Sequence, residues 1–194
     1  KVGVLGAGVM GGQIAAHLNN VGLEVIAFDL DLDIAKKGLE ATKKLKPSPY
    51  YNIKTADKIQ AASFDQLDLL KDCDWVVEAI AEKIEWKTDL YSKIEPHLSE
   101  NVIVTSNTSG LLLSDLTSKM SDSLKKRFFI THFFNPPRYM KLVEIICSDE
   151  TDKKYISFID NFLQEILGKG VVHAKDTPNF IANRIGVYGM MVTL

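Results

Sequence analysis

The sequence predicts an α/β protein with a doubly wound, mostly parallel sheet and helices on both faces. Three observations support this fold class: short apolar runs alternate with segments of helical periodicity, the run DWVVEAI is apolar at nearly every position, and a glycine-rich turn follows the first run. A strand that is apolar throughout is typical of a parallel sheet, because helices cover both of its faces. Strands and helices that alternate with short links then give the doubly wound arrangement.

The expected strands are short, apolar and rich in β-branched residues. They lie within residues 1–8, 23–31, 59–62, 74–80, 101–109, 127–137 and 142–148. The first, fifth and sixth of these ranges end in a glycine turn, a polar turn and a Pro-rich loop that begins at His132. The first two flank a helical segment and form a βαβ unit of about thirty residues, in which a right-handed crossover lays the strands side by side.

The expected helices are bounded by recognisable start and stop residues. They are residues 11–22, 33–46, 63–73, 85–98, 111–125 and 151–167. Gly22 and Gly168 are stop signals, PSPYY interrupts the chain after the second helix, and Ser63 with Gln66 forms the pattern of a capping box. Residues 170–194 are expected to end the chain as strand, turn and helix.

Composition narrows the class of function. The chain has 194 residues, enough for one good core, and a formal net charge of −2, which gives no general attraction to nucleic acid or an anionic membrane. No apolar run reaches the roughly 18 residues that a membrane span needs. Cys73 and Cys147 lack the spacing of a zinc site or a disulfide framework, so we expect no metal and a reducing, cytoplasmic setting. The expected partner is a small molecule.

The glycine turn predicts a dinucleotide site of the Rossmann type. Gly6, Gly8 and Gly11 form GxGxxG directly after a strand and at the start of a helix, with Val9 and Met10 between the last two glycines. The first glycine permits the tight turn, the second lets a pyrophosphate approach the backbone, and the third lets helix and strand pack closely. The start of the helix offers free N–H groups and a positive dipole end to the phosphates.

Asp29 favours NAD over NADP. It lies 29 − 11 = 18 residues beyond the last glycine, at the end of the second strand, where a carboxylate accepts hydrogen bonds from the adenosine ribose. Its negative charge would repel a 2′-phosphate, and no arginine lies nearby in the sequence to replace it. The alternative is that Asp29 only caps the following helix or turn.

His132 and Glu144 are the candidate catalytic pair. His132 follows a strand, and an imidazole suits the transfer of a hydroxyl proton near neutral pH. Glu144 lies inside the apolar strand LVEII, where a buried carboxylate needs a partner. Pairing with His132 would meet that need and orient the ring. The alternatives are a structural histidine and a solvent-facing glutamate; His17, His97 and His173 are interpreted as structural.

Six motifs, taken in order, resemble the 3-hydroxyacyl-CoA dehydrogenase family of fatty-acid β-oxidation. They are GAGVMG, VVEAIAE, SNTSG, HFFNPP, KLVEII and AKDTPNFIANRIG. The resemblance covers almost the whole chain, and HFFNP followed by KLVE and DTPNFIANR is its most specific part.

The resemblance implies residue roles. His132 would be the general base and Glu144 its partner, while Ser109 and Asn183 would hydrogen-bond the reacting oxygen or the thioester carbonyl of the substrate. The positions that would contact the ribose and nicotinamide of NAD are Glu82, Lys87, Ser109 and Asn135. Without the resemblance, Ser109 and Asn183 would be interpreted as capping or turn residues.

The activity implied is the NAD-dependent oxidation of (S)-3-hydroxyacyl-CoA to 3-ketoacyl-CoA. Three alternatives stay open: a 3-hydroxybutyryl-CoA dehydrogenase that works mainly in the reductive direction, a non-catalytic NAD-binding module, and a structural protein built on the same fold. The presence of His132, Glu144, Ser109 and Asn183 argues against the non-catalytic module, because a module without chemistry has no need for a buried His–Glu pair.

Two departures from the family pattern affect the expected partners. The family commonly carries a long helical hairpin after the second strand that helps hold CoA, whereas the span from Asp29 to Trp75 is shorter and broken by PSPYY. We assign residues 1–180 to the NAD-binding domain and 181–194 to the start of a link to a C-terminal helical domain, which in the family closes the site and mediates dimerisation. Alone, the chain is expected to bind NAD but to turn over acyl-CoA poorly, and its parent is expected to form a homodimer.

Overall fold

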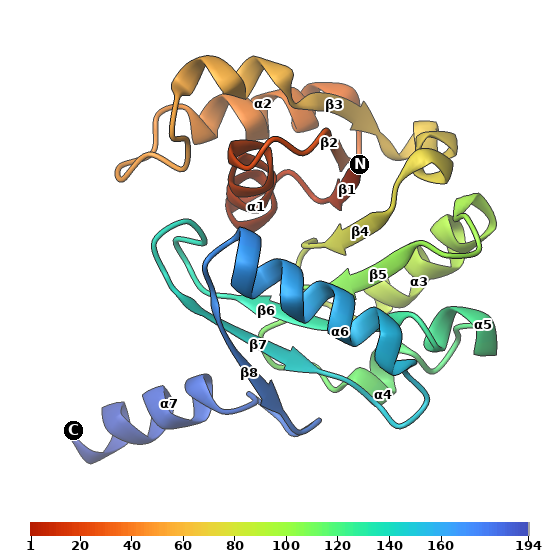
Figure 1. The fold of residues 1–194 in the computed structure, drawn as a ribbon, viewed down its shortest axis with the longest axis vertical. Helices are drawn as coiled ribbons and strands as arrows, with labels where there is room; N and C mark the ends of the chain where they lie inside the picture. The colour runs from red at the N-terminus through yellow and green to blue at the C-terminus, as the bar shows by residue number, and fades with distance from the viewer. Residues whose placement is uncertain (194) are drawn as a thin grey trace.

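One eight-stranded sheet organises the chain. The computed structural model describes residues 1–193, and its strands lie in the order β3-β2-β1-β4-β5-β6-β7-β8 (Figure 1). The strands are β1 (Val2–Leu5), β2 (Val25–Asp29), β3 (Gln60–Ser63), β4 (Trp75–Glu78), β5 (Ile103–Ser106), β6 (Phe128–Phe133), β7 (Leu142–Ile146) and β8 (Gly170–Ala174). Every neighbouring pair is parallel except β6 with β7, so the predicted mostly parallel, doubly wound sheet is confirmed.

The chain reverses its direction of progress across the sheet at β1. It first builds β2 and β3 on one side of β1 and then returns to place β4 on the other side. In an open α/β sheet, ligands bind at such a switch point, beyond the carboxyl ends of the strands. The glycine turn that follows β1 lies at this point.

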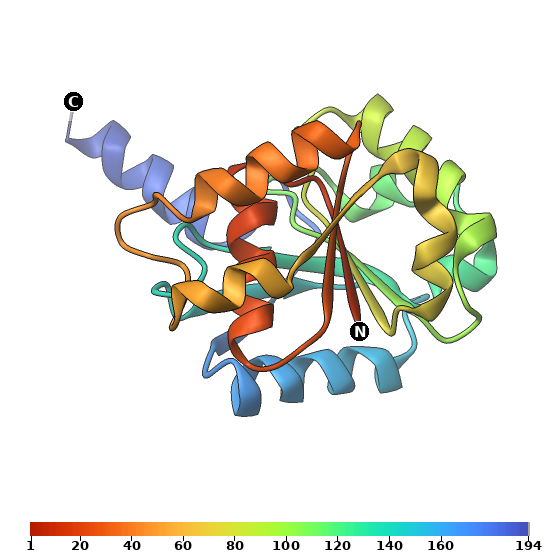
Figure 2. The ribbon, with the colours of Figure 1, turned by 90° about the horizontal axis from the view of Figure 1, so that it is seen from above.

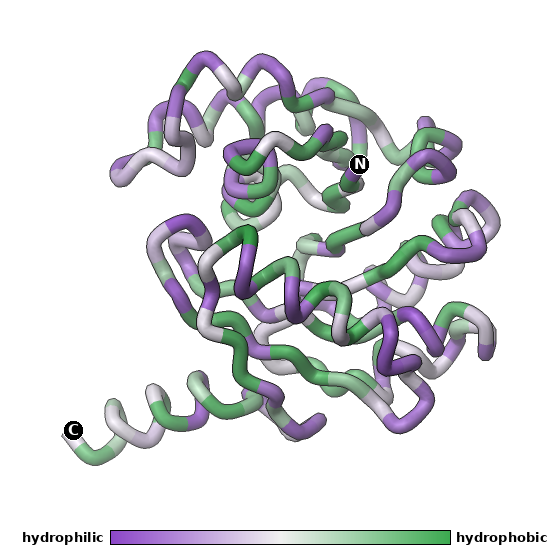
Figure 3. Tube along the Cα trace, viewed as in Figure 1, coloured by the Kyte–Doolittle hydropathy of each residue, from purple (hydrophilic) through white to green (hydrophobic). Residues whose placement is uncertain are grey.

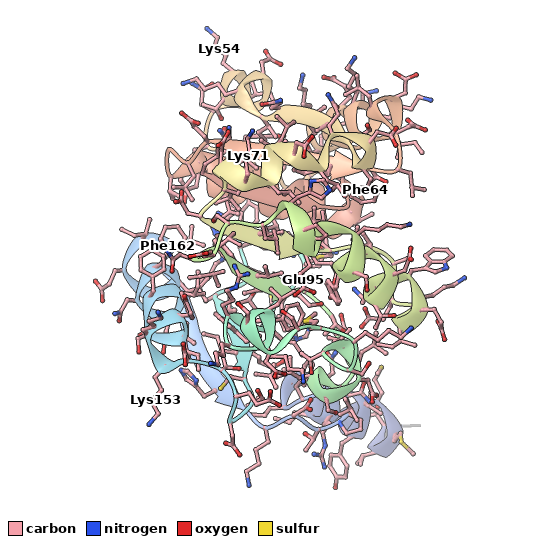
Figure 4. All side chains as sticks on the ribbon, turned by 90° about the vertical axis from the view of Figure 1, so that its right-hand side faces the viewer. Lys54, Phe64, Lys71, Glu95, Lys153 and Phe162 are labelled. Atoms are coloured by element: carbon pink, nitrogen blue, oxygen red, sulfur yellow. The ribbon has the colours of Figure 1, made fainter. Side chains whose placement is uncertain are left out.

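Helices cover both faces of the sheet, as Figure 2 shows for α1 and α3. On one face α1 (Val9–Asn20), α2 (Leu32–Thr42) and α6 (Lys153–Asn161) bury apolar side chains against the strands. On the other face the covering elements are η2 (Phe64–Asp72), α3 (Ile84–Ile94), α4 (Leu113–Leu116) and α5 (Asp122–Lys125). Lysines such as Lys54 and Lys153 are exposed and project away from the body (Figure 4).

Successive side chains of β4 pack into the two cores on opposite faces of the sheet. Trp75 and Val77 belong to the first core, whereas Val76 belongs to the second. All four residues of β4 are buried, as expected for a central parallel strand. Glu78 is therefore a carboxylate placed at the end of an otherwise apolar strand.

Several expected helices are shorter than predicted, for local reasons. Residues 111–125 were expected as one helix but form α4 and α5, because Ser121 caps a new helix by accepting a hydrogen bond from Leu124 N. The helix expected over residues 33–46 is α2, which ends at Thr42. The helix expected over 85–98 changes after Ile94 to the 3-10 turn η3 (Glu95–His97), which contains Pro96.

Two further elements differ from expectation. Residues 151–167 end as the π-helical turn η4 (Phe162–Ile166) after α6, and the 3-10 helix η1 (Ile53–Lys58) was not predicted. The capping box at Ser63 and Gln66 is confirmed. Between β2 and β3 the structure has α2 and η1, and the segment that contains PSPYY lies between these two helices.

The last helix, α7 (Ala182–Val192), projects from the body of the molecule (Figure 1). Figure 3 shows hydrophobic positions along it, and Ile185, Tyr188 and Met191 are among its exposed apolar residues. The helix expected at the end of the chain is thus present, while the boundary at residue 180 stays a prediction. Within residues 1–193, no helix has the length and apolar character needed to cross a membrane.

Gly38 gives a test of how α2 is fixed to the glycine turn. A Cβ at this position would lie 2.1 Å from the carbonyl oxygen of Ala7, so Gly38→Ala must push α2 away from the turn. We expect a loss of about 1–3 kcal/mol in the free energy of unfolding, measured with urea. Gly170→Ala is the control, because a Cβ there meets nothing within 4 Å. Equal stability of the two variants would contradict this packing.

Candidate active site and dinucleotide cleft

The three glycines of the turn differ in what surrounds them. Gly6 has a φ of +97°, and a Cβ there would lie 2.8 Å from Ala79 O. A Cβ on Gly11 would lie 1.8 Å from Gly6 O, whereas a Cβ on Gly8 would meet nothing within 4 Å. The first and third glycines are therefore required by the packing of the protein itself. Gly8 leaves open space on the outside of the turn.

Backbone N–H groups at the start of α1 face that space. Gly8 is the N-cap of α1, and no side chain caps the helix. Its first amides carry the positive end of the helix dipole, which suits an anion such as a phosphate. Val9, next in the chain, is 69% exposed. Met10 is half-buried.

A cleft of about 530 Å³ opens beside the turn, within the size range of small-molecule sites. Its lining includes Gly8, Asp29, Phe64, Trp86 and Leu90. Phe64, one of these lining residues, is labelled in Figure 4. Its mainly apolar wall suits a flat ring system, and Asp29 adds a carboxylate.

Asp29 is tied to the glycine turn by its own carboxylate. Oδ2 accepts a hydrogen bond from Ala7 N at 2.8 Å, and Oδ1 accepts one from Leu30 N at 2.8 Å. The cap of α2 is supplied by Asp31, whose side chain accepts from Ile34 N. The interpretation of Asp29 as the cap of the following helix is therefore wrong. Its role at the following turn is limited to the bond from Leu30.

His132 and Glu144 face one another across the antiparallel pair of β6 and β7. The strand register places them directly opposite, and His132 Nδ1 lies 2.8 Å from Glu144 Oε2. Their exposed fractions are only 4% and 1%, so neither is a surface residue. Because a carboxylate can only accept a hydrogen bond, the Nδ1 atom of His132 is the donor to Glu144. The neutral ring therefore carries its proton on Nδ1, and Nε2 has the free lone pair.

Glu144 has two further partners. Its other oxygen, Oε1, accepts hydrogen bonds from Ile181 N at 3.0 Å and from Ala182 N at 2.9 Å, at the start of α7. The buried carboxylate is thus satisfied on both oxygens. The alternative of a solvent-facing Glu144 is wrong.

Ser109 and Asn183 are brought together by the fold. Asn183 Nδ2 donates to Ser109 O at 2.9 Å, although the two residues lie 74 positions apart. Ser109 N donates to Glu82 Oε1 at 2.8 Å. Ser109 itself is exposed, in the loop that follows β5.

Glu82 and Lys87 belong to one charged network. Lys87 is 1% exposed, and its Nζ lies 3.4 Å from Glu82 Oε2. Burial pushes the pKa of Glu82 upward, but the hydrogen bond from Thr108 and the charge of Lys87 outweigh burial, so the pKa of this carboxyl is lowered. Glu82 therefore stays ionised and holds the loop at Thr108 and Ser109.

Glu78 is the centre of the same network and was not singled out from the sequence. This fully buried carboxylate accepts from Lys87 Nζ and Tyr91 Oη, both at 2.5 Å, from Ser106 Oγ at 2.6 Å and from Ile80 N at 2.8 Å. The signal was available, because Glu78 is an acid inside the apolar run DWVVEAI, as Glu144 is inside LVEII.

Asn135 follows β6, the strand that carries His132, and contacts α1. Its Oδ1 accepts from Gln13 Nε2 of α1 at 3.1 Å. The strand that carries His132 is held near its end by Asn107, whose Oδ1 accepts from Phe133 N at 2.9 Å. These bonds connect the two parts of the site.

The other three histidines lie outside this constellation. His97 and His173 pair with aspartates, Asp68 and Asp160 respectively. Burial, with the nearby charges of Lys169 and Arg138, lowers the pKa of His17 to about 4. Among residues 1–193, no group of three or more histidine, cysteine or acidic side chains could hold a metal ion.

Arg138 is one of the residues that hold the segment PSPYY. Arg138 donates to Ser48 O at 2.8 Å and to Tyr50 O at 2.7 Å, and its guanidinium lies over the rings of Tyr51 and Tyr139. The loop after His132 is thereby joined to the connection after α2.

Comparison with known proteins gives a consistent result. The family model described as 3-hydroxyacyl-CoA dehydrogenase, NAD binding domain, matches residues 1–177. A probable 3-hydroxyacyl-CoA dehydrogenase of Bacillus subtilis (strain 168) is 43% identical over all of this chain and 27% of its own length. One of Deinococcus radiodurans is 42% identical over 98% of this chain and 58% of its own length.

A solved structure agrees with these relatives. The (S)-3-hydroxybutyryl-CoA dehydrogenase of Ralstonia eutropha is similar with a TM-score of 0.81 and 31% identity, over 98% of this chain and 72% of that protein. The chain thus spans only part of the proteins that it matches.

Gly8 provides a test of the dinucleotide cleft. Because a Cβ there meets no protein atom, Gly8→Ala should fold normally, yet its methyl group would occupy the space that a pyrophosphate needs. We expect the dissociation constant for NADH, measured by fluorescence titration, to rise about tenfold or more, which corresponds to about 1.4 kcal/mol. Gly186→Ala, on α7, is the matched control. Unchanged NADH binding by Gly8→Ala would place the phosphates elsewhere.

Proposed function

The chain belongs to the 3-hydroxyacyl-CoA dehydrogenase family, as its NAD-binding domain, and from this premise we propose that the whole protein oxidises (S)-3-hydroxyacyl-CoA to 3-ketoacyl-CoA. The observation that carries the proposal is the buried pair of His132 and Glu144 in a domain that also holds the dinucleotide turn. A domain that only bound a nucleotide would have no need for it.

NAD is the cofactor, and the residues present fit it. Gly8 leaves space for a pyrophosphate beside free helix amides, and Asp29 stands in the cleft where a ribose would meet a carboxylate rather than a cation. When bound, NAD accepts a hydride from the substrate. In the proposal, Glu82, Lys87 and Asn135 lie along the ribose and nicotinamide. Lys87 would act mainly through Glu82, because its ammonium is already engaged by carboxylates.

His132 is the proposed general base. Its Nε2 would take the hydroxyl proton of the substrate, while Glu144 fixes the tautomer and stabilises the imidazolium that results. Ser109 and Asn183 would bind the reacting oxygen or the thioester carbonyl. Their direct hydrogen bond supports a shared position near the substrate.

Three aspects of the whole protein stay proposals. A helical domain after α7 would cover the exposed apolar residues of that helix, close the site and mediate a homodimer. The chain by itself would bind NADH and turn over acyl-CoA poorly. A cytoplasmic location is predicted from the cysteine content of the sequence.

Replacement of His132 by glutamine tests the proposed base. In the whole protein, His132→Gln should lower kcat on a 3-hydroxyacyl-CoA by a factor of about 10²–10⁴, the usual contribution of general-base catalysis. The NADH dissociation constant should hardly change, because the proposed role of His132 is to take the substrate proton and not to bind the cofactor.

His173→Gln is the matched control, since His173 is a partly exposed histidine paired with Asp160. Turnover should be retained in this variant. Unchanged turnover in His132→Gln would remove His132 from the mechanism.

The similarity to the Ralstonia structure favours one second candidate, a 3-hydroxybutyryl-CoA dehydrogenase that works mainly in the reductive direction. Rates on C4 and C16 substrates, in both directions, distinguish the candidates. For β-oxidation we expect turnover on C16 as well as C4. Activity confined to C4 and faster in reduction would support the second candidate instead.

A further inference from the structure

The segment 179–182, which follows β8 and includes the first residue of α7, contacts the candidate site at several points. We propose that this segment is a positioning element that orients His132 and the loop of Ser109. The inference rests on the proposed function, in which His132 is the base. It adds residues that lie beyond 177, where the family match ends.

The first contact is the shared carboxylate. Glu144 accepts from His132 Nδ1 on one oxygen and from the amides of Ile181 and Ala182 on the other. The carboxylate is buried, so these protein donors satisfy its charge in place of water. If the two amides move, Glu144 loses partners that it cannot replace, and its hold on the imidazole changes.

The second contact is aromatic. Phe180 is 1% exposed, and its ring centroid lies 5.7 Å from that of His132. Phe134 lies 4.4 Å from His132 by the same measure. Two aromatic rings and one carboxylate therefore limit the orientations that the imidazole can adopt.

Two residues of the segment have positive φ angles, and this backbone conformation sets the positions of the contacting groups. Asn179 has a φ of +63° and Phe180 a φ of +47°, which is the left-handed region that residues other than glycine rarely adopt. Asn179 also packs on Gly110, where a Cβ would lie 2.7 Å from Asn179 Oδ1. Such a conformation persists only when its surroundings fix it, and it is common at functional sites.

The third contact is with the loop that carries Ser109. Asn183, one residue beyond the segment, donates to the carbonyl of Ser109. Glu144 and the Ser109 loop are thus both joined to the start of α7. The position of α7 is in this way coupled to the orientation of the base.

Substitutions at Asn179 test the backbone. Asn179→Val places a β-branched residue at positive φ and should shift the segment, whereas Asn179→Gly keeps the left-handed conformation. The measurement is the proton NMR signal of the His132 imidazole Nδ1–H, recorded on the chain of residues 1–194. The signal is assigned to His132 because it is missing from the spectrum of His132→Gln. We expect Asn179→Val to shift or broaden this NMR signal and Asn179→Gly to preserve it. A segment with only a structural role would leave the signal in place in both variants.

Phe180→Leu tests the ring without changing the backbone. In the whole protein we expect kcat/KM to fall about tenfold while the NADH dissociation constant stays within about twofold, because small misplacements of a catalytic group reduce rate more than cofactor binding. Phe158→Leu, at an exposed position of α6, is the matched control.

The outcomes separate the two proposals. Loss of turnover in His132→Gln together with an unchanged NMR signal in Asn179→Val and unchanged kcat/KM in Phe180→Leu would overturn the positioning role and leave the proposed function intact. A changed NMR signal in a protein that does not oxidise 3-hydroxyacyl-CoA would support the coupling and reject the function.

Discussion

The carboxylate of Glu144 is the interaction on which the candidate active site depends. It lies inside the sheet on β7, where an ionised group is costly unless every oxygen has a partner. The partners come from β6, through His132, and from the start of α7. One buried charge therefore fixes the histidine and the direction in which the chain leaves the domain.

A second buried carboxylate organises the other side of the site in the same way. Glu78 ends β4 and binds Lys87 and Tyr91 of α3 together with Ser106 of β5. Lys87 also forms an ion pair with Glu82, and Glu82 accepts a hydrogen bond from Ser109 N and so holds that loop. Polar networks of this kind are favourable only when all members are satisfied, so they specify one arrangement of strands and helices. This buried network therefore fixes the loop at Ser109, which follows the carboxyl end of β5.

Much of this arrangement could be predicted. The glycine turn, Asp29 and the pairing of His132 with Glu144 follow from residue type, spacing and the need of a buried carboxylate for a partner. The same reasoning applied to Glu78 would have found the second carboxylate. Helix ends were predicted less well, as at residues 111–125, because Ser121 starts a new helix within a segment that still has helical periodicity.

The sequence by itself determined the fold class, the dinucleotide turn and the pairing of His132 with Glu144, because each depends on local periodicity or on glycines and polar residues in or after strands. Only the tertiary structure decided that Glu144 also binds the amides of residues 181 and 182, that Phe180 packs on His132, and that Lys87 is enclosed by two carboxylates. The physical reason is that backbone amides carry no sequence signature, and strand register and helix packing bring distant residues together.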